Sequence, residues 1–573
     1  MARAERPKLG EILVQRGQLT NEALELALDE QKQLPRKRGR VRRLGRVLID
    51  KGYVIEEHVA EALATQLDVP YVDLKYYDIK TEVTQKLPEA QARRFRAVVL
   101  EETAKGYKVG MADPTDLNAY DELARALQRE IEIAVVTDSQ LLAVIDRVYR
   151  RTGEISGFAR ELGAAMGDTV VDFGAPVSSP GIEDAPVVKL LQSVFEDATQ
   201  VRASDIHIEP QERSLRIRFR IDGVLCAQSE ADAKISSALV LRLKLMSGLD
   251  IAEKRLPQDG RFNVKIRHGT LDVRISTMPT QFGESVVMRL LNQGGGLLTL
   301  DRLGMPPRIL GRVQAVLARP SGMILVTGPT GSGKTTTLYA ALATLNTPSH
   351  KIITVEDPIE YRLPGVNQVQ VHEKIDLGFG RVLRSALRQD PDVILVGEMR
   401  DQETVDTGLR AAMTGHLVLS TLHTNDAVST PMRLLDMGAP RYMVAFSLQL
   451  VVAQRLVRLI CESCAEPHEP LPGEWQWLTQ ELPAGAAPSY LKGKGCSRCN
   501  GTGYLGRTGV YEMLEMTRPV VEAANGDDPA VFFAVATREM AGDTLGVHAA
   551  SLAAAGKTTV GEAMRISSQM DAN

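Results

Sequence analysis

One short segment has residues whose types and spacing suit phosphate binding. Gly328, Gly333, Lys334 and Thr335 fit the pattern G-x-x-x-x-G-K-[ST]. Glycines let backbone N–H groups turn inward around phosphate oxygens, the lysine reaches the β- and γ-phosphates, and the threonine hydroxyl ligates Mg²⁺. An apolar run precedes the segment and a helix-forming run follows it, so a helix N-terminus would add a favourable field for the anion. We predict a nucleotide site at Gly328, Pro329, Thr330, Gly331, Ser332, Gly333, Lys334, Thr335 and Thr336, with Thr335 on Mg²⁺.

Hydrolysis of a bound triphosphate also needs a group that orients or activates water beside the γ-phosphate. Glu398 follows the apolar run 393–396 after a single glycine, Gly397. We predict Glu398 as the residue that positions the water. The same spacing also fits a solvated carboxylate at the end of a strand.

A second acidic cluster, Glu356, Asp357 and Glu360, follows the apolar run 352–355. One of these carboxylates could hold Mg²⁺ through water, and another could help to activate the nucleophile. The alternative is a helix-start cap around Pro358.

Two histidines, His416 and His423, flank the apolar run 417–422. A histidine at a strand end near the phosphates can contact the γ-phosphate through a hydrogen bond. A lone histidine beside an apolar strand is more often structural, so the sequence leaves both roles open.

Four of the five cysteines form two Cys-x-x-Cys pairs that 31 residues separate. Each pair supplies two thiolates at a tight turn, and together they would make a closed tetrahedral Cys₄ site for zinc. Gly501 and Gly503 allow a knuckle-like turn beside the second pair. The alternative is a set of buried thiols, as we expect for Cys226. The predicted zinc ligands are Cys461, Cys464, Cys496 and Cys499.

The first 75 residues contain the same pattern twice, with an offset of 35 positions. Each copy predicts a short helical piece, a glycine turn and a longer helix. The spacer 32–42 is basic and could contact phosphate or anionic headgroups, or form a solvated loop. The matching pairs are Leu9 and Leu44, Gly10 and Gly45, Gly17 and Gly52, Leu28 and Leu63, and Gln31 and Gln66.

The elements that must position these residues divide the chain into successive parts. Residues 76–150 alternate strand-like and helical stretches, 151–183 predict a flexible linker, and 184–295 begin with a helix followed by alternating strands. Short apolar runs separated by helical segments in 296–460 predict a largely parallel sheet. Residues 461–505 hold the cysteine pairs, and 506–573 predict a mostly helical tail.

Composition excludes several classes of protein. The formal net charge is −4 and charged residues make up 24% of the chain, so it is not a general nucleic-acid binder. There is no run of about 18 apolar residues for a membrane-spanning helix. The start of the chain is polar and charged, without the apolar core of a signal peptide. We expect a cytoplasmic protein, with any membrane contact peripheral or through a partner.

Four segments together resemble one family. GPTGSGKTTT, VEDPIEY, RQDPDVILVGEMRD and TGHLVLSTLHTND resemble the Walker A, Asp box, atypical Walker B and His box of the type II secretion and type IV pilus ATPase superfamily. ASDIHIEP, RFRIDGVL and RLPQDGRF resemble its second N-terminal domain, which is PAS-like. The fold class this implies is α/β: a RecA-like P-loop ATPase core preceded by an α+β domain, with an N-terminal helical and α+β regulatory domain and a Cys₄ zinc subdomain.

The resemblance also implies function. It indicates a homohexamer on the cytoplasmic side of the inner membrane that hydrolyses ATP, turns a platform protein in that membrane and adds pilin subunits to a filament. Lys334 and Thr335 would clamp the nucleotide, Glu398 would be the catalytic glutamate, and Glu356 and Asp357 would form the Asp box, with Asp357 near Mg²⁺. His416 and His423 match the His box. Assembly ATPases of this family often have a zinc subdomain and retraction ATPases lack one, which favours filament extension.

Arginines of the preceding domain are expected to complete the catalytic site. Arg218 and Arg220 alternate with Ile217 and Phe219 and therefore project from one face of a strand. An arginine supplied from a neighbouring domain stabilises transition-state charge. A solvated strand face is the alternative, and Arg255 and Arg261 are weaker candidates.

The repeat resembles a tandem cyclic-di-GMP-binding module, best known in mannose-sensitive haemagglutinin pilus ATPases. Basic side chains would contact phosphate, glutamines would read guanine edges and leucines would pack on the bases. The first copy has lysine where the pattern favours arginine. A helical module that docks on a membrane-protein partner is the alternative. The ligand residues implied are Lys8, Leu9, Gly10, Leu28, Gln31, Arg43, Leu44, Gly45, Leu63 and Gln66.

Two other functions stay open from the sequence. Ring-forming P-loop ATPases also translocate nucleic acid, although that would need a basic pore and we expect no nucleic-acid partner. The other alternative is a non-catalytic, nucleotide-dependent docking protein. The intact Lys334, Thr335 and Glu398 argue against it.

Overall fold

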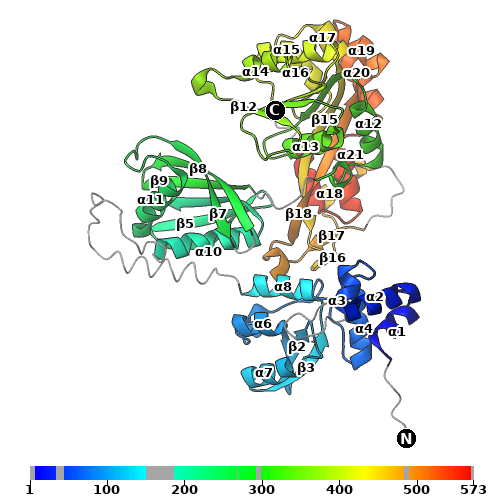
Figure 1. Cartoon of the computed structure of the whole chain (residues 1–573). Helices are drawn as coiled ribbons and strands as arrows, with labels where there is room; N and C mark the ends of the chain where they lie inside the picture. The colour runs from blue at the N-terminus through cyan, green and yellow to red at the C-terminus, as the bar shows by residue number, and fades with distance from the viewer. Residues whose placement is uncertain are drawn as a thin grey trace. The chain divides into compact units, whose positions relative to one another are not determined.

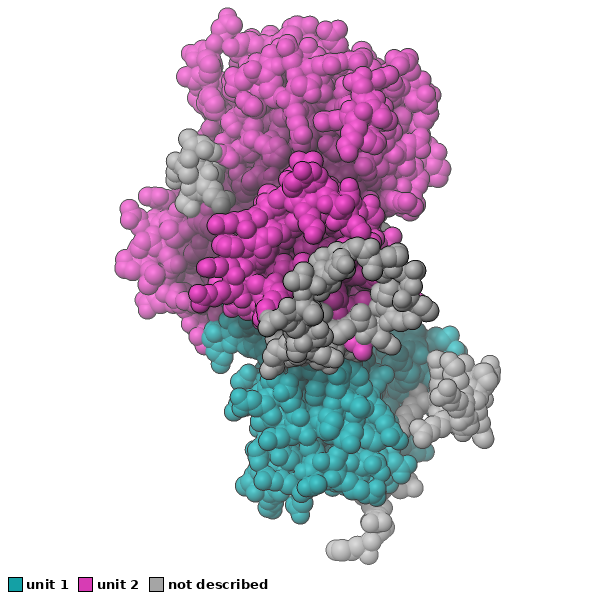
Figure 2. Space-filling view, turned by 90° about the vertical axis from the view of Figure 1, so that its left-hand side faces the viewer, with its two compact units in different colours: residues 1–153, 461–464, 494–503 teal, residues 154–460, 465–493, 504–573 magenta. Residues whose placement is uncertain are grey.

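The computed structural model describes residues 7–33, 44–149, 186–266, 269–291, 298–482 and 489–568. The chain forms two compact units (Figure 2): residues 1–153, 461–464 and 494–503 form one, and residues 154–460, 465–493 and 504–573 form the other. The predicted linker 151–183 lies outside the described residues, as do Arg43 and most of the basic spacer.

The duplicated sequence folds into two helical hairpins, as predicted. The first copy gives α1 (Leu9–Gln15) and α2 (Asn21–Gln33), and the second gives α3 (Leu44–Asp50) and α4 (Glu56–Leu67). Helix α1 packs against α4, and α2 packs against α3. The repeat therefore also duplicates its core: the buried pairs at the 35-residue offset are Ile12 and Val47, Leu13 and Leu48, Leu19 and Val54, and Ala27 and Ala62.

The repeated glycines Gly10 and Gly45 let each short helix approach the next helix closely. A Cβ on Gly10 would lie 2.6 Å from Leu24 Cδ1, and one on Gly45 would lie 2.8 Å from Val59 Cγ1. Real Cβ atoms do not approach other atoms so closely, so the neighbouring side chain must move. The glycine of the motif has a packing role whether or not it touches a ligand.

We predict that Gly10→Ala destabilises the helices α1–α4 by about 1–3 kcal/mol, because it overpacks the contact with Leu24. Gly311 is the control, since it lies exposed in helix α12 (Pro307–Leu317) and a Cβ there would meet nothing within 4 Å. At Gly311, alanine should be neutral or stabilising by up to about 1 kcal/mol. Hydrogen exchange in each helix measures both effects, and equal protection in wild type and Gly10→Ala would contradict the prediction.

A small α/β domain follows the repeat, also as predicted. Its sheet has the order β1-β2-β3, with β1 and β2 antiparallel and β2 and β3 parallel. Helices from both sides of these strands in the sequence share its core. The elements are α5 (Thr81–Thr84), α6 (Glu89–Phe95), β1 (Ala97–Glu102), β2 (Gly106–Met111), α7 (Leu117–Leu127), β3 (Glu130–Val135) and α8 (Asp138–Val148).

Residues 186–291 form an antiparallel sheet with two helices on one face (Figure 1). The strand order is β6-β5-β4-β9-β8-β7. Strand β5 alternates as predicted: Leu215, Ile217 and Phe219 are buried, whereas the arginines between them face the other side. The elements are α10 (Pro186–Gln200), β4 (Ala203–Pro210), β5 (Ser214–Ile221), β6 (Val224–Asp232), α11 (Ser236–Ser247), β7 (Gln258–Ile266), β8 (Gly269–Thr280) and β9 (Gly283–Leu291).

The largest sheet has seven strands in the order β12-β11-β13-β14-β10-β15-β18. All neighbouring pairs are parallel except β15 with β18. The elements are β10 (Gly322–Thr327), α13 (Lys334–Leu345), β11 (Ile352–Glu356), β12 (Asn367–Gln370), α14 (Phe379–Ala386), β13 (Val393–Val396), α15 (Gln402–Met413), β14 (Leu417–Leu422), α16 (Ser429–Asp436), α17 (Arg441–Ser447) and β15 (Leu448–Ile460).

This sheet is buried on both faces, which explains its continuous apolar runs. In β10, Met323 and Leu325 join the core shared with α15 and α17, whereas Ile324 and Val326 join the core shared with α12 and α13. The predicted parallel α/β core is confirmed.

The tail is less helical than the prediction for residues 506–573. It opens with the long strand β18 (Tyr504–Glu515), which pairs antiparallel with β15 and closes one edge of the large sheet. This strand was not predicted from the sequence because Gly506 and Gly509 interrupt its apolar pattern. Helices follow as predicted: α19 (Arg518–Asn525), α20 (Pro529–Met540), α21 (Leu545–Ala554) and α22 (Val560–Ser568).

Between β15 and β18 the chain forms two small strands and a helix: β16 (Ala465–Pro467), α18 (Pro472–Glu481) and β17 (Leu491–Gly493). Among the described residues, no helix is long and apolar enough to cross a membrane.

Candidate active site and cysteine cluster

The register of the parallel strands brings the predicted catalytic segments to one edge of the large sheet. Val326 of β10 lies opposite Thr421 of β14, and Val396 of β13 lies opposite both Ser420 of β14 and Val355 of β11. The segments that leave the carboxyl ends of these strands therefore start at the same level. Ligands of open α/β sheets bind at such an edge.

The phosphate loop between β10 and α13 has the backbone that its glycines permit. Gly328, Gly331 and Gly333 all have positive φ, at 144°, 80° and 89°. Gly328 also approaches β15: a Cβ there would lie 2.4 Å from the carbonyl oxygen of Gln454. Any side chain at Gly328 would push the loop away from the sheet, so this glycine is needed for both conformation and space.

Lys334 begins helix α13 and reaches back over the loop. Its Nζ donates to the carbonyl oxygens of Gly328 at 2.6 Å and Pro329 at 3.2 Å, and lies 3.5 Å from Nδ1 of His423. The pKa of Lys334 is lowered to about 8, mainly by burial; Glu398 opposes this shift and Arg455 adds to it. A triphosphate in the loop would supply the negative charge that this ammonium needs.

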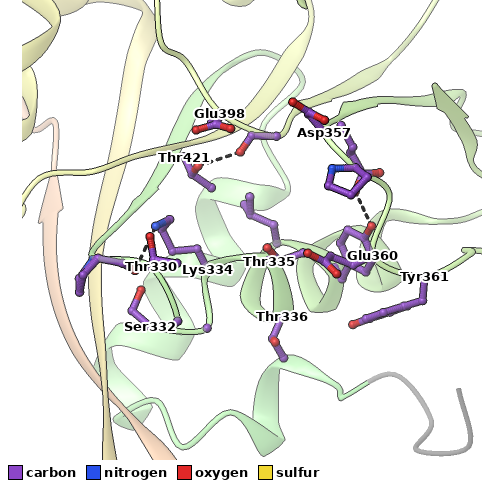
Figure 3. Close-up of a pocket in the computed structure, with 18 of the residues that line it drawn as sticks. Thr330, Ser332, Lys334, Thr335, Thr336, Asp357, Glu360, Tyr361, Glu398 and Thr421 are labelled. Carbon is purple, nitrogen blue, oxygen red and sulfur yellow. Dashed lines mark hydrogen bonds between the residues drawn. The ribbon is translucent and has the colours of Figure 1, made fainter. Parts of the chain in front are cut away.

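Glu398 faces Lys334 across the pocket from the end of β13 (Figure 3). Its carboxylate pairs with Arg400 at 2.5 Å and lies 3.7 Å from Nε2 of His423. Burial is the main cause that lowers the pKa of His423, with Lys334 adding to it. A neutral His423 can accept or donate one hydrogen bond beside the carboxylate.

Glu356 lies at the end of β11 and is 3% exposed. Its carboxylate accepts hydrogen bonds from Tyr339 Oη, from Thr354 Oγ1 at 2.6 Å and from Gln368 Nε2 at 3.2 Å. Burial and this bond to Glu356 raise the pKa of Tyr339. Because its oxygens are already engaged, Glu356 can position α13 and β12 around the site; of the acidic cluster, Asp357 is exposed and lines the pocket.

The pocket at this edge has a volume of about 600 Å³, within the range for nucleotide-sized ligands. Thr335 and Asp357 both line it and would supply a hydroxyl and a carboxylate oxygen for Mg²⁺, the ligand types that this ion prefers. Of the predicted site residues, those that line the pocket are Pro329, Thr330, Gly331, Ser332, Gly333, Lys334, Thr335, Thr336, Glu356, Asp357, Glu360, Glu398 and His423.

His416 does not lie at this edge. It precedes β14, so the six-residue strand separates it from His423 by roughly 20 Å. Its Nδ1 lies 3.1 Å from the carbonyl oxygen of Ala411. The two histidines of the motif thus have different positions, and only His423 lines the pocket.

The predicted arginines of β5 do not line this pocket. Arg218 pairs with Glu209 at 2.6 Å, and Arg220 lies 3.8 Å from Asp205. Arg255 and Arg261 pair with Glu253 and Asp272 in their own domain. Their catalytic role stays a prediction for a site on another copy of the chain.

The structure adds cations that the sequence did not single out. Arg289 of β9, Arg400 and Arg507 of β18 line the nucleotide pocket. Arg274 of β8 holds the acidic loop after β11 through Glu360, at 3.1 Å, and through the carbonyl oxygen of Ile359. For Arg289 the only signal was its place in an alternating strand, which does not tell a cation that lines a pocket from one that faces open solvent.

The four cysteines converge as predicted. Their sulfur atoms all lie within 4.8 Å of one another, and three of the separations are 3.8–3.9 Å. Four thiolates about 2.3 Å from a zinc ion at tetrahedral angles would be roughly 3.8 Å apart. Cys499 Sγ also accepts backbone N–H groups of Cys496 and Gly503, both at 3.2 Å. The residues therefore fit a closed, structural Cys₄ zinc site.

A glycine-lined phosphate loop, a following lysine and acidic strand ends around one pocket define a P-loop nucleoside triphosphatase. More specifically, the chain belongs to the Type II/IV secretion system protein family, which matches residues 182–565, and it is an ATPase of that family. The MshEN domain matches residues 67–155, which cover the small α/β domain and begin where the repeat ends.

Relatives extend the comparison over most of the chain. The type IV pilus assembly ATPase PilB of Myxococcus xanthus is 41% identical over 523 residues, covering 88% of this chain and 89% of its own length. The type II secretion system ATPase E of Vibrio cholerae is 42% identical over 440 residues, covering 75% of this chain and 86% of its own. Among solved structures, the Legionella pneumophila ATPase DotB has the same fold, with 19% identity, a TM-score of 0.51, and coverage of 69% of this chain and 98% of DotB.

We predict that nucleotide binding takes up a proton near pH 8. Burial lowers the pKa of Lys334 to about 8, so about half of these side chains are neutral at that pH. Phosphate charge favours the ammonium form and returns the pKa toward its ordinary value. Uptake should be near zero at pH 6.5 and about half a proton at pH 8, and it should rise further at pH 9.

Calorimetry in buffers of different ionisation enthalpy measures this uptake. His423→Asn is the matched control, because the pKa of His423 is lowered and that side chain is already neutral at pH 8. The control should leave the uptake unchanged. A pH-independent uptake in wild type would contradict the assignment to Lys334.

Proposed function

We propose that the chain is the hexameric, ATP-hydrolysing motor of a type IV pilus or type II secretion pseudopilus, and that it drives assembly of the filament. The observation that carries the proposal is the placement of Lys334 and Glu398 on opposite sides of one pocket (Figure 3). The pilus-assembly and secretion functions of the two relatives support the choice of system.

In this proposal each side chain around the pocket has a separate task. The loop N–H groups and Lys334 hold the β- and γ-phosphates, while Thr335 and Asp357 hold Mg²⁺. Glu398 orients the attacking water and accepts its proton, and Arg400 and His423 hold the Glu398 carboxylate in place. Arg289 on this chain, with Arg218 and Arg220 from a neighbouring copy, would stabilise the charge on the transferred phosphoryl group.

The partners follow from the same proposal. A ring of six copies would act on a platform protein in the inner membrane, so the chain would be cytoplasmic and peripheral to that membrane. The Cys₄ cluster supports filament extension rather than retraction, given the family's usual distribution of zinc subdomains.

We predict that Glu398→Gln lowers the rate of ATP hydrolysis about 10²–10⁴-fold, the range expected for loss of a general base, and leaves ATP binding within a few-fold of wild type. Lys334→Ala should instead abolish binding. Glu469→Gln, an exposed carboxylate beyond the sheet, is the control with wild-type turnover. Phosphate release and fluorescent-nucleotide titration measure the two effects. Turnover by Glu398→Gln within threefold of wild type would refute the catalytic assignment.

We further propose that cyclic-di-GMP regulates this motor by binding the repeat. Two hairpins with duplicated cores suit a ligand made of two identical halves. Leu28 is exposed, and Gln31 and Gln66 are partly exposed at equivalent positions of α2 and α4, so these side chains are accessible to a ligand. The adjoining MshEN match supports the proposal.

The predicted effect of Gln31→Ala with Gln66→Ala is a loss of cyclic-di-GMP affinity of roughly five- to 150-fold for each lost guanine contact, since such contacts discriminate by about 1–3 kcal/mol. Gln15→Ala, on the exposed side of α1, is the matched control and should bind normally. Titration of labelled ligand onto the full chain is the measurement. Absence of wild-type binding at tens of micromolar would favour the docking module instead.

A further inference from the structure

The turns between the paired cysteines present polar side chains to one loop of the N-terminal domain. Glu462 and Ser463 lie between Cys461 and Cys464, and Arg498 lies between Cys496 and Cys499. All three side chains meet Lys75, and all of these residues belong to the same compact unit. We refer to residues 461–464 and 494–503 as the knuckle.

The contacts with Lys75 use both its side chain and its backbone. Lys75 Nζ pairs with Glu462 Oε2 at 2.5 Å, which raises the pKa of the lysine. Ser463 Oγ donates to the Lys75 carbonyl oxygen, and Arg498 Nη1 lies 3.5 Å from the same atom. Arg498 Nη1 also donates to Ser463 Oγ at 2.8 Å, so the two turns of the knuckle act together on one residue.

The loop that carries Lys75 is fixed within its own domain. Asp73 Oδ1 accepts the N–H of Lys75 at 2.9 Å, closing a tight turn. The next residue back, Leu74, is 2% exposed and donates its N–H to Gln140 of α8 at 3.0 Å. Lys75 is therefore attached firmly to the α/β domain and moves together with it.

The knuckle depends on its cysteines for its shape. Its two segments are joined by the four sulfur atoms and by few backbone bonds, such as Cys461 N–H to the Gly503 carbonyl at 2.9 Å and Lys494 N–H to the Cys464 carbonyl at 3.0 Å. A zinc ion on the four thiolates would hold Ser463 and Arg498 in their present relation. Without that link, the two turns would keep the Arg498–Ser463 hydrogen bond and the strand pairing on either side of them, and would lose the bonds through the four sulfur atoms.

The knuckle also continues directly into two strands of the ATPase sheet. Cys461 follows Ile460, the last residue of β15, and Gly503 precedes Tyr504, the first residue of β18. Six residues before Cys461, Arg455 and its neighbour Gln454 lie behind the phosphate loop, where Gln454 accepts from Thr337 of α13 at 2.6 Å. A displacement of the knuckle can thus reach the nucleotide site through one continuous strand.

We propose that the metal-built knuckle is a docking surface for the regulatory N-terminal domain of this same chain, with loop 73–76 as its occupant. An exposed ion pair and a few polar contacts hold weakly, so the contact can open and close while the domains stay folded. In the docked state, a movement of the regulatory domain displaces the knuckle and, with it, β15 and β18. This regulatory role rests on the proposed function, whereas the docking itself does not.

A zero-length carbodiimide cross-linker, which joins an amine to a carboxylate in direct contact, tests the docking in the full zinc-loaded chain. We expect a Lys75–Glu462 cross-link in the mass spectrum, and its yield should fall at least fivefold when a chelator removes the metal. Cysteine alkylation confirms removal. The internal control is Lys108–Glu101, an ion pair of 3.1 Å within the same domain, which should cross-link equally before and after chelation.

Several results would overturn the docking proposal. One is a Lys75–Glu462 yield that does not change after the cysteines become alkylated. Another is no such cross-link in zinc-loaded protein that does form Lys108–Glu101. The charge-swapped double variant Lys75→Glu with Glu462→Lys should regain the cross-link, and its failure to do so would also count against the pairing.

A second arm tests the coupling. Glu462→Lys repels Lys75 and should keep basal ATP turnover and cyclic-di-GMP affinity within threefold of wild type, while reducing the ligand-induced change in turnover at least fivefold. Glu466→Lys, an exposed carboxylate four residues further on, is the matched control and should respond fully. A full response in Glu462→Lys would overturn the coupling. Absence of ligand binding in wild type would overturn the regulatory part of the proposed function, and the cross-link would still decide the docking.

Discussion

Parallel pairing of β11, β13, β14 and β10 is the constraint on which the nucleotide site depends. Each of these strands needs a crossover connection, so the strands enter and leave the sheet in the same direction. Their carboxyl ends then share one edge, and the chain leaves them with a phosphate loop, an acidic cluster, a glutamate and a histidine. None of these groups is near another in sequence. The register of the strands therefore places these groups at the same edge.

The same sheet explains why the site is both rigid and connected. Its central strands are buried on both faces, so a shift of one strand would disturb two cores. Strand β15 differs from the others because its thirteen residues, Leu448–Ile460, continue past the site to the first cysteine. Its antiparallel partner β18 returns from the last knuckle residue. These two strands form a ribbon that contacts the phosphate loop at Gln454, in the middle of β15, and continues from there to the cysteine cluster.

Patterns that are local in sequence could be predicted, and those that depend on distant partners could not. The phosphate loop, the cysteine pairs and the helices of the repeat each follow from residues within a short window. Glu356 shows the limit: its carboxylate is occupied by Tyr339, Thr354 and Gln368, and no spacing rule places those three donors around it. The two histidines show a second limit. They lie at opposite ends of β14, and only the direction of this strand decides which of them lies at the pocket. Arg289 could not be told from other strand arginines because its neighbours at the pocket come from a different domain.

The repeat and the knuckle are both short segments that must hold their shape, and different interactions stabilise them. Below about 40 residues a chain rarely buries enough apolar surface to hold its shape. The repeat overcomes this by pairing two copies, so that α1 packs on α4 and α2 on α3 around one shared core. The knuckle has no such core, and its two short turns are held by strand pairing on either side and by a cluster of four cysteines that fits a metal ion. The turns of the knuckle contact Lys75 through polar side chains, and polar contacts at an exposed surface are weak and directional. Such a surface is suited to a contact that is specific and can open. The apolar core of the repeat is suited to a contact that stays closed.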